Sequence, residues 1–494
     1  MKQQSLWELP RNDTIKETKK RKFDLIILGG GIAGMTTAYF LKDYPGTIAL
    51  LEKGRIGHGV SSHSTGKLTY LQGIYHKIEK ATNLASAKLY WKSQKEAISL
   101  AESIILKEEI KCNYHEVSSY LFASKESEEK TLEQEIKCCE EIGMSFSAVA
   151  PHEIVLPFTK AYKVEETAVF HPVKFITGLK ERIPNCLFQE GVIAKTLRKT
   201  EQGYEIDSNK GVWTAKMVVT TTHYPFFIQP GYIPFKTSIE RSYLVSAKTR
   251  EAKYQSGINV GNEVLSFRYH YDTDEYIMLA GESHLLTHHY DSAKRYEELR
   301  KKFQHIVPCP IEYQWMTHDI MSEDSLPMIG KLEPNLYLAT AFNKWGMTNG
   351  ILAGKIISDL ILKGSSPYEA LVSPTRHLTL HRLLKRIYNG LETSTLYIKT
   401  TLVKNHTFYQ TAYVIKENGI PYGIYIDEQG KTHKVLNKCP HLRCNLIFNR
   451  IDKTWDCPCH GSRFNIDGNL IEGPSTSSIS LCPTNKADPK EKKS

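Results

Sequence analysis

The stretch Phe23-Asp24-Leu25-Ile26-Ile27-Leu28-Gly29-Gly30-Gly31-Ile32-Ala33-Gly34 decides the fold of the first part of this chain. Its first six residues are typical of a buried parallel strand, and the residues from Met35 to Leu41 continue as a helix. Gly29, Gly31 and Gly34 satisfy the pattern G-x-G-x-x-G. The first glycine permits a tight turn, the second lets a pyrophosphate approach the backbone, and the third lets helix and strand pack closely. The pattern predicts a dinucleotide-binding unit in which the helix N-terminus faces the phosphates.

A second predicted strand, Thr47–Leu51, supports this interpretation. It ends at Glu52, 21 positions after Gly31, where a carboxylate should hold the ribose hydroxyls of the dinucleotide. Strand, glycines, helix, strand and acid together are far more specific than a glycine triplet alone. No second G-x-G-x-x-G follows a strand and opens a helix, so the sequence predicts no NAD(P)H site.

The residues after Glu52 indicate which dinucleotide is bound. Lys53–Lys67 form a long loop rich in Gly, Ser and Thr. It resembles the loop that runs along the flavin in the D-amino-acid oxidase-like flavoprotein superfamily, which includes glycine oxidase and enzymes that oxidise sarcosine and dimethylglycine. Asp324–Gly330, Leu336–Ala341 and Gly346–Gly350 resemble the C-terminal flavin signature of that superfamily.

The resemblance implies FAD as a cofactor. A helix that begins near Gly346 would point its positive end at the flavin pyrimidine edge and stabilise the anionic reduced flavin; the alternative is that it only packs in the core. The strand Val218–Thr222 runs on into His223-Tyr224, where the superfamily usually has a small-residue turn, so that contact stays open. His63-Ser64-Thr65-Gly66 also resembles a His-x-x-Gly that can carry flavin covalently in dimethylglycine-oxidising relatives. The residues that the resemblance places on the cofactor are Gly29, Gly31, Gly34, Glu52, Ser62, His63, Val192, Gly346, Met347 and Thr348.

A second motif lies near the C-terminus. Cys439-Pro440-His441 and Cys457-Pro458-Cys459-His460 are separated by 15 residues. This C-x-H…C-x-x-H pattern matches Rieske [2Fe-2S] sites, in which two thiolates hold one iron and two imidazoles the other. Zinc is the competing interpretation, but zinc knuckles favour C-x-x-C pairs, whereas Cys457 and Cys459 are spaced C-x-C. The predicted cluster ligands are Cys439, His441, Cys457 and His460.

The flanks of this motif resemble the Rieske proteins of cytochrome bc-type complexes. The resemblance implies a disulfide between Cys444 and Cys459, a hydroxyl at Ser462 that hydrogen-bonds a cluster sulfide, and a covering loop at Gly473-Pro474. Phe464 stands where high-potential members carry Tyr, so we expect a lower reduction potential. Arg443 replaces the usual Gly. A Rieske oxygenase is excluded, because no His follows His460 to complete a mononuclear iron site.

Composition is that of an ordinary globular protein, with 494 residues, 41% hydrophobic, 24% charged and a net charge of +10. Basic runs at both ends are interpreted as solvated tails, so no nucleic-acid partner is expected. No signal peptide and no membrane span is predicted. We therefore expect a cytoplasmic protein. Helical sequence is expected from about Lys77 to Gly143 and again at His377–Tyr388. We expect an α/β FAD-binding Rossmann-like domain with an inserted mixed-sheet substrate domain, plus a C-terminal all-β Rieske domain. The predicted segments are a flexible basic segment at 1–22, the FAD-dependent oxidoreductase domain at 23–363 with its insertion at about 80–180 and 225–320, a linker and helix at 364–400, the Rieske domain at 401–485 and a polar tail at 486–494.

Taken together, the two resemblances imply an FAD-dependent dehydrogenase. Its substrate would be a small amine or amino-acid-like molecule oxidised at a CH–NH or CH–NH₂ group, and electrons would pass from flavin through the cluster to an unknown external acceptor, or in reverse from a donor. Two alternatives stay open: an oxidase that uses O₂ with the Rieske domain as a structural or redox-sensing module, and a non-catalytic redox-sensing or binding protein. Arg241, Tyr243, Arg268 and Tyr269 are candidate substrate contacts, because an Arg beside a Tyr suits a carboxylate; the alternative is surface charge and sheet aromatics.

Overall fold

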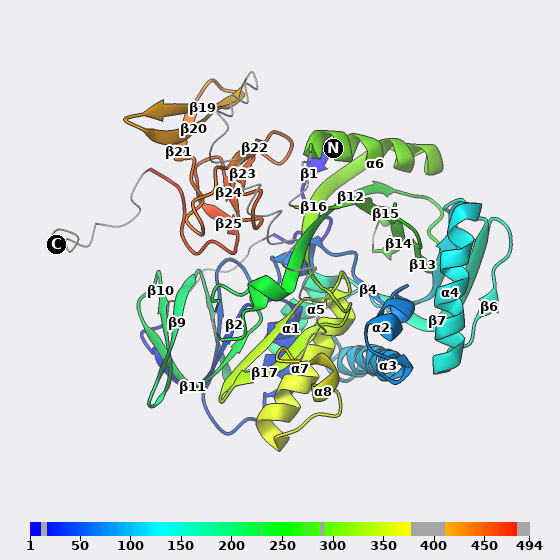
Figure 1. Ribbon diagram of the computed structural model, residues 1–494, viewed down its shortest axis with the longest axis horizontal. Coiled ribbons are helices and arrows are strands. Elements are labelled where there is room, and N and C mark those ends of the chain that lie inside the picture. The colour runs from blue at the N-terminus through cyan, green and yellow to red at the C-terminus, as the bar shows by residue number, and fades with distance from the viewer. Residues whose placement is uncertain (11–16, 229, 273, 287–290, 377–410, 482–494) are drawn as a thin grey trace. The chain divides into compact units, whose positions relative to one another are not determined.

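Figure 1 shows the computed structural model of the chain, which describes all residues except 11–16, 229, 273, 287–290, 377–410 and 482–494. The chain divides into two compact units. The first comprises Met1–Leu285 and Ala293–Leu383, and the second comprises Leu286–Ser292 and Leu384–Ser494.

The first unit contains a largely parallel sheet that holds the glycine motif. Its strand order is β17-β18-β11-β2-β3-β8, in which neighbouring strands from β18 to β8 are parallel and β17 is antiparallel. The central strand β2 is apolar without alternation, as expected for a strand buried on both faces. The strands are β2 (Lys22–Leu28), β3 (Ile48–Glu52), β8 (Cys186–Glu190), β11 (Trp213–Thr220), β17 (Met328–Glu333) and β18 (Leu336–Thr340), with β9 (Ala194–Thr200) and β10 (Gly203–Ser208) continuing from β11.

Two helices that follow parallel strands cross closely on this sheet: α1 (Ile32–Phe40) after β2 and α7 (Gly346–Lys363) after β18. Small residues allow the approach, since a Cβ on Gly354 would lie 2.5 Å from the Oγ1 of Thr36. The same hydroxyl donates a hydrogen bond to the carbonyl of Gly350 at 2.9 Å. Because both helices follow parallel strands, their N-termini lie at the carboxyl edge of the sheet, where α/β folds bind their ligands.

The second sheet of this unit forms the inserted region. Its order is β1-β16-β12-β15-β14-β13-β5-β7-β4, and β6 pairs with β7. Its strands are β1 (Lys2–Gln3), β4 (Lys67–Leu68), β5 (His115–Ala123), β6 (Ser147–Ala148), β7 (Lys160–Val169), β12 (Thr237–Lys248), β13 (Gln255–Asn259), β14 (Ser266–Tyr271), β15 (Glu275–Leu285) and β16 (Ile311–Ser322). The other helices of the unit are η1 (Val60–His63), α2 (Tyr75–Ala81), α3 (Leu84–Lys107), α4 (Glu126–Ile142), α5 (Pro172–Glu181), η2 (Ile233–Lys236), α6 (Ser292–Ile306) and α8 (Glu369–Val372).

Two expectations about this unit need correction. The stretch from Lys77 to Gly143 is not helical throughout, because β5 interrupts it and pairs with both β7 and β13. The N-terminal segment is not flexible over its described part, since β1 pairs with β16 and Trp7 is completely buried. In both places long-range pairing decides the structure, which local sequence does not reveal. The helix expected at His377–Tyr388 and the tail at 486–494 lie outside the described residues.

Over the residues of the second unit that the structure describes, the elements from β19 to β25 are all strands, as predicted. One antiparallel sheet has three strands, β19 (Ala412–Glu417), β20 (Ile420–Ile426) and β21 (Thr432–Leu436). The other has four short antiparallel strands, β22 (Ile447–Asn449), β23 (Thr454–Asp456), β24 (Arg463–Asn465) and β25 (Leu470–Glu472). Trp455, Phe464 and Val435 are buried in the common core. The predicted fold class is thus confirmed for both parts of the chain.

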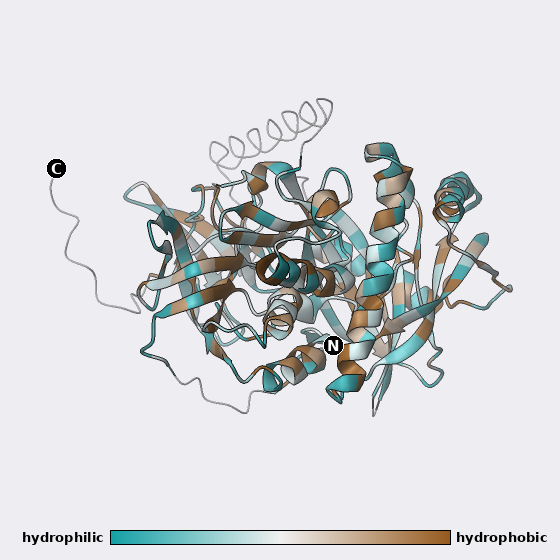
Figure 2. Cartoon of the chain, turned by 90° about the horizontal axis from the view of Figure 1, so that it is seen from below, coloured by the Kyte–Doolittle hydropathy of each residue, from teal (hydrophilic) through white to brown (hydrophobic). Residues whose placement is uncertain are grey.

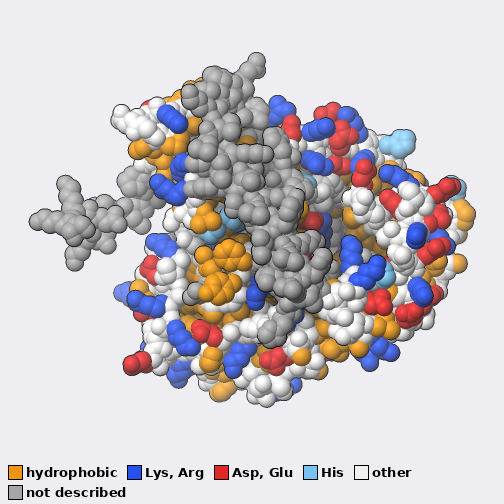
Figure 3. Space-filling model, viewed as in Figure 1, with side chains coloured by type: hydrophobic (Ala, Val, Ile, Leu, Met, Phe, Trp, Pro, Cys, Tyr) orange, Lys and Arg blue, Asp and Glu red, His pale blue; other side chains and the backbone are white. Residues whose placement is uncertain are grey.

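Hydropathy follows this architecture. Figure 2 shows hydrophobic segments in the interior strands and helices of the first unit, with polar segments outside. On the face seen in Figure 3, basic and acidic side chains of the first unit are intermixed. None of the helices in the described part of the chain has both the length and the hydropathy that a bilayer crossing requires.

Candidate cofactor sites

The glycine turn between β2 and α1 has the geometry that a dinucleotide site requires. Gly29 has a φ of +106°, and a Cβ on Gly34 would lie 1.9 Å from the carbonyl oxygen of Gly29, so neither position admits a side chain. Gly31 is the N-cap of α1 and has no side chain to cap it, and of the first helical amides that of Ile32 donates to Ser61 Oγ. A helix N-terminus whose N-cap is glycine still suits an anionic pyrophosphate, which can approach the backbone closely there.

Glu52 lies at the carboxyl end of β3, beside this turn. Its Oε2 accepts a hydrogen bond from the amide of Gly30 at 2.7 Å, and its Oε1 accepts one from Gly54 at 2.8 Å. The amide of Val192 donates to the Glu52 carbonyl at 2.9 Å. The structure therefore brings the predicted residues Glu52 and Val192 together at one edge of the sheet.

The Ser-rich loop follows, with Val60–His63 as the turn η1. Ser61 Oγ accepts from the amide of Ile32 at 3.0 Å, which ties the loop to the first turn of α1. Ser62 Oγ donates to the carbonyl of Gly59 at 2.9 Å, and Nδ1 of His63 is 3.0 Å from the same oxygen. When Nδ1 donates to that carbonyl, the proton of the neutral imidazole is on Nδ1 and Nε2 of His63 is unprotonated.

The predicted residues Gly346, Met347 and Thr348 form the first turn of α7. Within the described chain no side chain caps this helix at Trp345. A buried polar network fixes the next residue: Asn349 Oδ1 accepts from Gln94 Nε2 at 3.0 Å, and Asn349 Nδ2 is 3.1 Å from the hydroxyl of Tyr90. Buried hydrogen bonds therefore hold the first turns of α7 in place.

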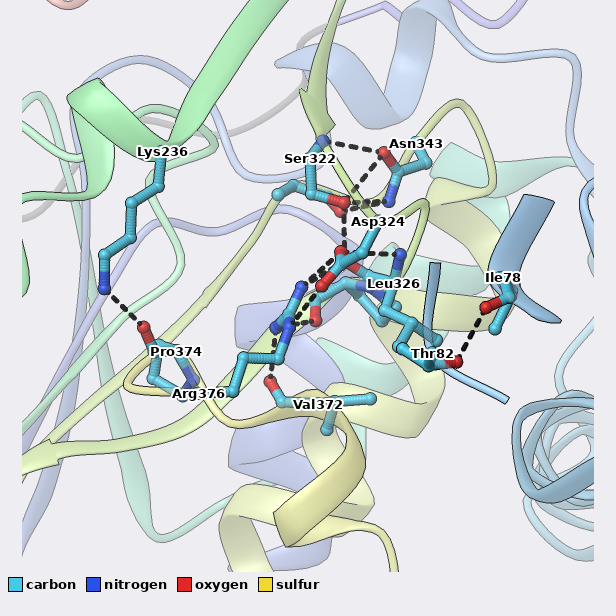
Figure 4. A network of polar contacts seen from close by, with 12 residues as sticks. Ile78, Thr82, Lys236, Ser322, Asp324, Leu326, Asn343, Val372, Pro374 and Arg376 are labelled. Carbon is cyan, nitrogen blue, oxygen red and sulfur yellow. Dashed lines mark hydrogen bonds and ion pairs between the residues drawn. The ribbon is translucent and has the colours of Figure 1, made fainter. Parts of the chain in front are cut away.

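The Asp324 loop, part of the C-terminal signature, is fastened by a buried ion pair (Figure 4). Arg376 Nε and Nη2 donate to the two carboxylate oxygens of Asp324, both at 2.7 Å. Burial alone would raise the pKa of Asp324, but the hydrogen bonds and charge of Arg376 outweigh it and hold the pKa below its ordinary value. Asn343 links the residue just before this loop, Ser322, to the turn ahead of α7. Its Oδ1 accepts from the amide of Ser322 at 2.8 Å, and its Nδ2 donates to the carbonyl of Ala341 at 2.9 Å.

The four candidate substrate contacts do not lie together. Arg241 and Tyr243 share one face of β12, since they are two residues apart. Arg268 of β14 pairs with Met278 of β15, and Met278 pairs with Ser246 of β12. Ser246 lies five residues from Arg241, so Arg268 is displaced from Arg241 by roughly 17 Å along the strand direction. The two Arg–Tyr pairs therefore occupy two separate places on the sheet.

The two places differ in their hydrogen bonds. Arg241 is completely buried, and its Nε donates to Nε2 of His318 at 3.0 Å. Tyr243 OH is 3.2 Å from Nε2 of His284. Arg268 instead donates from Nη1 to the carbonyls of Thr65, Gly66 and Phe170, at 2.9, 2.9 and 3.0 Å. Tyr269, also on β14, is buried, and burial raises its pKa to about 12.

Sequence reasoning missed Lys67, which follows the Ser-rich loop on β4. Its ammonium is buried and donates to the carbonyl of Gly257 at 3.2 Å. Burial, and then the charge of Arg268, lower the pKa of Lys67 to about 7. The signal in the sequence was a single Lys before the largely apolar run from Leu68 to Leu71.

In the second unit, two loops bring the cluster motif together. The amide of Cys439 donates to the carbonyl of Cys444 at 2.9 Å, and that of Cys457 donates to Ser462 at 2.8 Å. The ring centroids of His441 and His460 are 5.0 Å apart. All four predicted ligands thus lie at the ends of two adjoining loops.

The donor set fits a two-iron cluster. The thiols of Cys439 and Cys457 contact each other, and this hydrogen bond lowers the pKa of Cys439 and raises that of Cys457. Burial lowers the pKa of His460 to about 4, so its imidazole is neutral, the form that binds metal. The buried Nδ1 atoms of His441 and His460 have no hydrogen-bond partner among the residues that the structure describes. Two thiols and two unpartnered imidazole nitrogens are the donors that a [2Fe-2S] cluster of this type takes.

The flanking residues surround these loops. Cys444 and Cys459 form a disulfide with Cα atoms 6.8 Å apart. Ser462 is buried, its Oγ accepts from the amide of Ser475 at 2.9 Å, and its hydroxyl contacts the Cys439 thiol. Arg443 has a φ of +61°, the left-handed region that favours glycine, so the turn keeps its shape at the cost of strain.

Comparisons with known proteins agree with both sites. A family model described as "FAD dependent oxidoreductase" matches residues 24–360, and one described as "Rieske [2Fe-2S] domain" matches residues 399–483. The Bacillus subtilis (strain 168) protein YhfW, whose name describes it as a Rieske 2Fe-2S iron-sulfur protein, is 29% identical over 467 residues, 92% of each chain. Gamma-glutamylputrescine oxidoreductase of Escherichia coli (strain K12) is 21% identical over 370 residues, 70% of this chain and 85% of that protein.

Among solved structures, glycine oxidase from Geobacillus kaustophilus shares the fold, with a TM-score of 0.60 at 18% identity over 73% of this chain and 100% of that one. These families use FAD and a [2Fe-2S] cluster, so both predicted cofactors are confirmed. The chain therefore belongs to the FAD dependent oxidoreductase family and carries a C-terminal Rieske [2Fe-2S] domain, which makes it an FAD- and [2Fe-2S]-dependent oxidoreductase.

Proposed function

We propose that this protein is a dehydrogenase that oxidises a small amine or amino-acid-like molecule at a CH–NH or CH–NH₂ group and passes the electrons to an external acceptor. The observation that carries the proposal is the presence of an FAD domain and a Rieske domain in one polypeptide. When bound, FAD accepts a pair of electrons from substrate and a [2Fe-2S] cluster carries electrons singly, so the two together suit transfer to a one-electron acceptor.

The substrate class is supported by relatives and by the site. Gamma-glutamylputrescine oxidoreductase and glycine oxidase carry names of amine and amino-acid chemistry. We assign Arg241 and Tyr243 to the substrate, because both are buried on one face of β12 and a guanidinium beside a phenol suits a carboxylate. Arg268 and Tyr269 are not included in this assignment, since Arg268 binds three backbone carbonyls.

The remaining residues hold the cofactors. We assign Gly29, Gly31 and Gly34 to the FAD pyrophosphate, Glu52 and Val192 to the adenosine end, and the loop with Ser62 and His63 together with the first turn of α7 to the flavin. Cys439, His441, Cys457 and His460 are assigned to the cluster, and Cys444 and Cys459 to a disulfide that joins its two loops.

The test is anaerobic mixing of the purified holoprotein with a panel of amines, amino acids and small alcohols. The proposal expects bleaching of the flavin absorbance by at least one amine or amino acid and by no alcohol. Replacement of Arg241 by Lys should raise KM for a carboxylate-bearing substrate at least tenfold, the cost of about 1.4 kcal/mol, because Lys lacks the planar bidentate donor. Flavin that no amine or amino acid reduces would refute the proposal and favour a redox-sensing role.

The acceptor is tested separately, since an oxidase that uses O₂ has the same flavin reaction. With the reactive substrate under air, the proposal expects little peroxide and rapid reduction of an added one-electron acceptor. Replacement of Cys439 by Ser should remove the acceptor activity. Stoichiometric peroxide that is unchanged by Cys439→Ser would instead identify an oxidase.

A further inference from the structure

Five consecutive backbone carbonyls of the Ser-rich loop each accept a hydrogen bond from a side chain outside the loop. Trp7 Nε1 donates to Ser64 at 2.7 Å, and Trp315 Nε1 donates to His63 at 3.0 Å. The same set includes Ser5 Oγ donating to Ser62, and Arg268 Nη1 donating to Thr65 and Gly66, both at 2.9 Å. These five hydrogen bonds constrain the backbone conformation of residues 62–66.

Two of these donors come from the N-terminal segment, which precedes the dinucleotide fold in the sequence. Ser5 and Trp7 are completely or almost completely buried. The amide of Trp7 also donates to the Oγ of Ser5 at 3.1 Å, so the two donors support each other. The donors are thus part of one compact turn.

The ring of Trp7 lies in a pocket of cationic and aromatic groups. It meets His171 and His270 edge-on at 4.9 Å, and the guanidinium carbon of Arg268 lies 5.1 Å from it. The ring therefore packs against Arg268, the same side chain that binds the carbonyls of Thr65 and Gly66.

The rest of the segment is fastened to the first part of the same loop. Arg55 donates to the carbonyls of Leu9 and Pro10 at 2.7 and 2.9 Å. Glu8 pairs with His58, with Oε2 to Nδ1 at 3.3 Å. The segment 5–10 thus contacts the loop at Arg55, His58, Ser62 and Ser64. We call residues 5–10 the strap.

We propose that the strap is a positioning element of the FAD site: Ser5 and Trp7 act through the loop 59–66 to set its conformation for the flavin. The inference rests on the proposed assignment of that loop to FAD, and it adds residues that lie before the strand–turn–helix pattern of the glycine motif. Neither Ser5 nor Trp7 needs to touch the cofactor, because the hydrogen bonds to the carbonyls of Ser62 and Ser64 carry the effect.

The test compares FAD affinity in full-length variants, measured by the fluorescence of released FAD. Trp7→Phe keeps an aromatic ring but removes the N–H donor to Ser64, and Ser5→Ala removes the donor to Ser62. Each should raise the FAD dissociation constant about tenfold, the fold-change expected for the loss of one buried hydrogen bond. Ser5→Thr keeps the hydroxyl and should restore most of the affinity and the visible circular dichroism of the bound flavin.

A matched control removes a buried indole elsewhere in the unit. Trp213 of β11 is also completely buried, but its Nε1 has no hydrogen-bond partner within the described chain. Trp213→Phe should lower thermal stability as much as Trp7→Phe and leave FAD affinity within twofold of the wild type. Unchanged FAD affinity in both Ser5→Ala and Trp7→Phe, or an equal loss in Trp213→Phe, would overturn the proposal. Neither result depends on whether an amine reduces the flavin, so the outcome is independent of the proposed activity.

Discussion

The three motif glycines at the start of α1 are constrained for different physical reasons. At Gly29 the φ of +106° and the carbonyl oxygen of Thr221, which would lie 2.5 Å from an added Cβ, both exclude a side chain. At Gly34 the obstacle is the Gly29 carbonyl at 1.9 Å. At Gly31 the nearest atom to a Cβ is Ser61 Oγ at 3.1 Å, so packing alone would nearly tolerate alanine. Its glycine is better explained by the close approach of a pyrophosphate.

Gly34→Ala should therefore yield a protein that is purified without FAD, or that fails to accumulate. A methyl group at that position forces α1 away from β2, at a cost of about 1–3 kcal/mol in packing alone. The ratio of flavin to protein absorbance measures the loss. The control is Gly364→Ala at the C-cap of α7, where nothing lies within 4 Å of the added methyl and only the left-handed φ of +79° opposes it. Equal flavin content in the two variants would contradict the role assigned to Gly34.

Phe464→Tyr should raise the reduction potential of the cluster. A phenol can donate a hydrogen bond to a thiolate sulfur, which favours the more negative reduced state. One such bond to a charged group is worth about 1.5–3 kcal/mol, or roughly 60–130 mV for one electron. Redox titration followed by EPR measures the shift. A potential equal to that of the wild type would show that the residue does not reach the cluster sulfurs.

At the residue scale, the cofactor residues have a clearer signal in the sequence than the substrate residues. The glycines, Glu52 and the four cluster ligands belong to short patterns whose spacing is itself the signal. Arg268 was predicted to bind substrate because a Tyr stands next to it, yet it binds carbonyls about 200 positions earlier in the chain. No local pattern reports such a contact, and the same holds for Ser5 and Trp7.

Among the elements, the Asp324 loop depends on one buried ion pair. Asp324→Asn should lower the free energy of unfolding by about 3 kcal/mol, because it leaves the guanidinium of Arg376 without its anion. The wild-type pKa is depressed in the folded state, so this stabilisation is present above the ordinary carboxyl pKa of about 3.9 and is lost as pH falls further. The variant should therefore lose less stability than the wild type below that pH.

Urea unfolding at neutral and acidic pH checks this prediction. Asp274→Asn is the control, because Asp274 forms an exposed ion pair with Lys248 that should contribute less than about 1 kcal/mol. A similar small effect for both variants would contradict the importance of the buried pair.

The turn of the first cluster loop offers a stabilising change. Arg443→Gly should raise the stability of the second unit by up to about 1 kcal/mol, since glycine adopts a φ of +61° without strain. Calorimetry of the holoprotein measures the shift in unfolding temperature. The control is Arg450→Gly in the same unit, where no left-handed backbone is relieved. This variant should lower the free energy of unfolding by about 0.4–1 kcal/mol, because glycine raises the conformational entropy of the unfolded chain. Destabilisation by Arg443→Gly would show that the side chain contributes more than its backbone strain costs.

Elements with a strong local signal were predicted well. The helix expected to begin near Gly346 does so and runs to Lys363, because its glycines, apolar run and following Gly364 are all local signals. β5 was missed, since its nine residues form a strand only by pairing with β7 and β13. The strap was missed for a similar reason, although Leu6, Trp7 and Leu9 in a polar stretch were a usable sign of burial.

For the whole molecule, the sequence predicts two cofactor-binding units, because each contains its own short motif, the glycine motif in one and the Cys/His motif in the other. It does not name the substrate, since Arg241 and Tyr243 lie on a sheet assembled from strands far apart in the chain. The proposed activity depends on both units acting in one catalytic cycle, and that coupling is a property of the intact protein. The decisive measurement must therefore follow both cofactors at once.

That measurement is freeze-quench EPR combined with stopped-flow absorbance, after anaerobic mixing of the holoprotein with an amine that bleaches its flavin. We expect the EPR signal of the reduced cluster to appear as the flavin is reduced, and we expect Cys439→Ser to keep the flavin reaction but lack the signal. A flavin that is fully reduced while the cluster stays oxidised would rule out electron transfer from flavin to cluster.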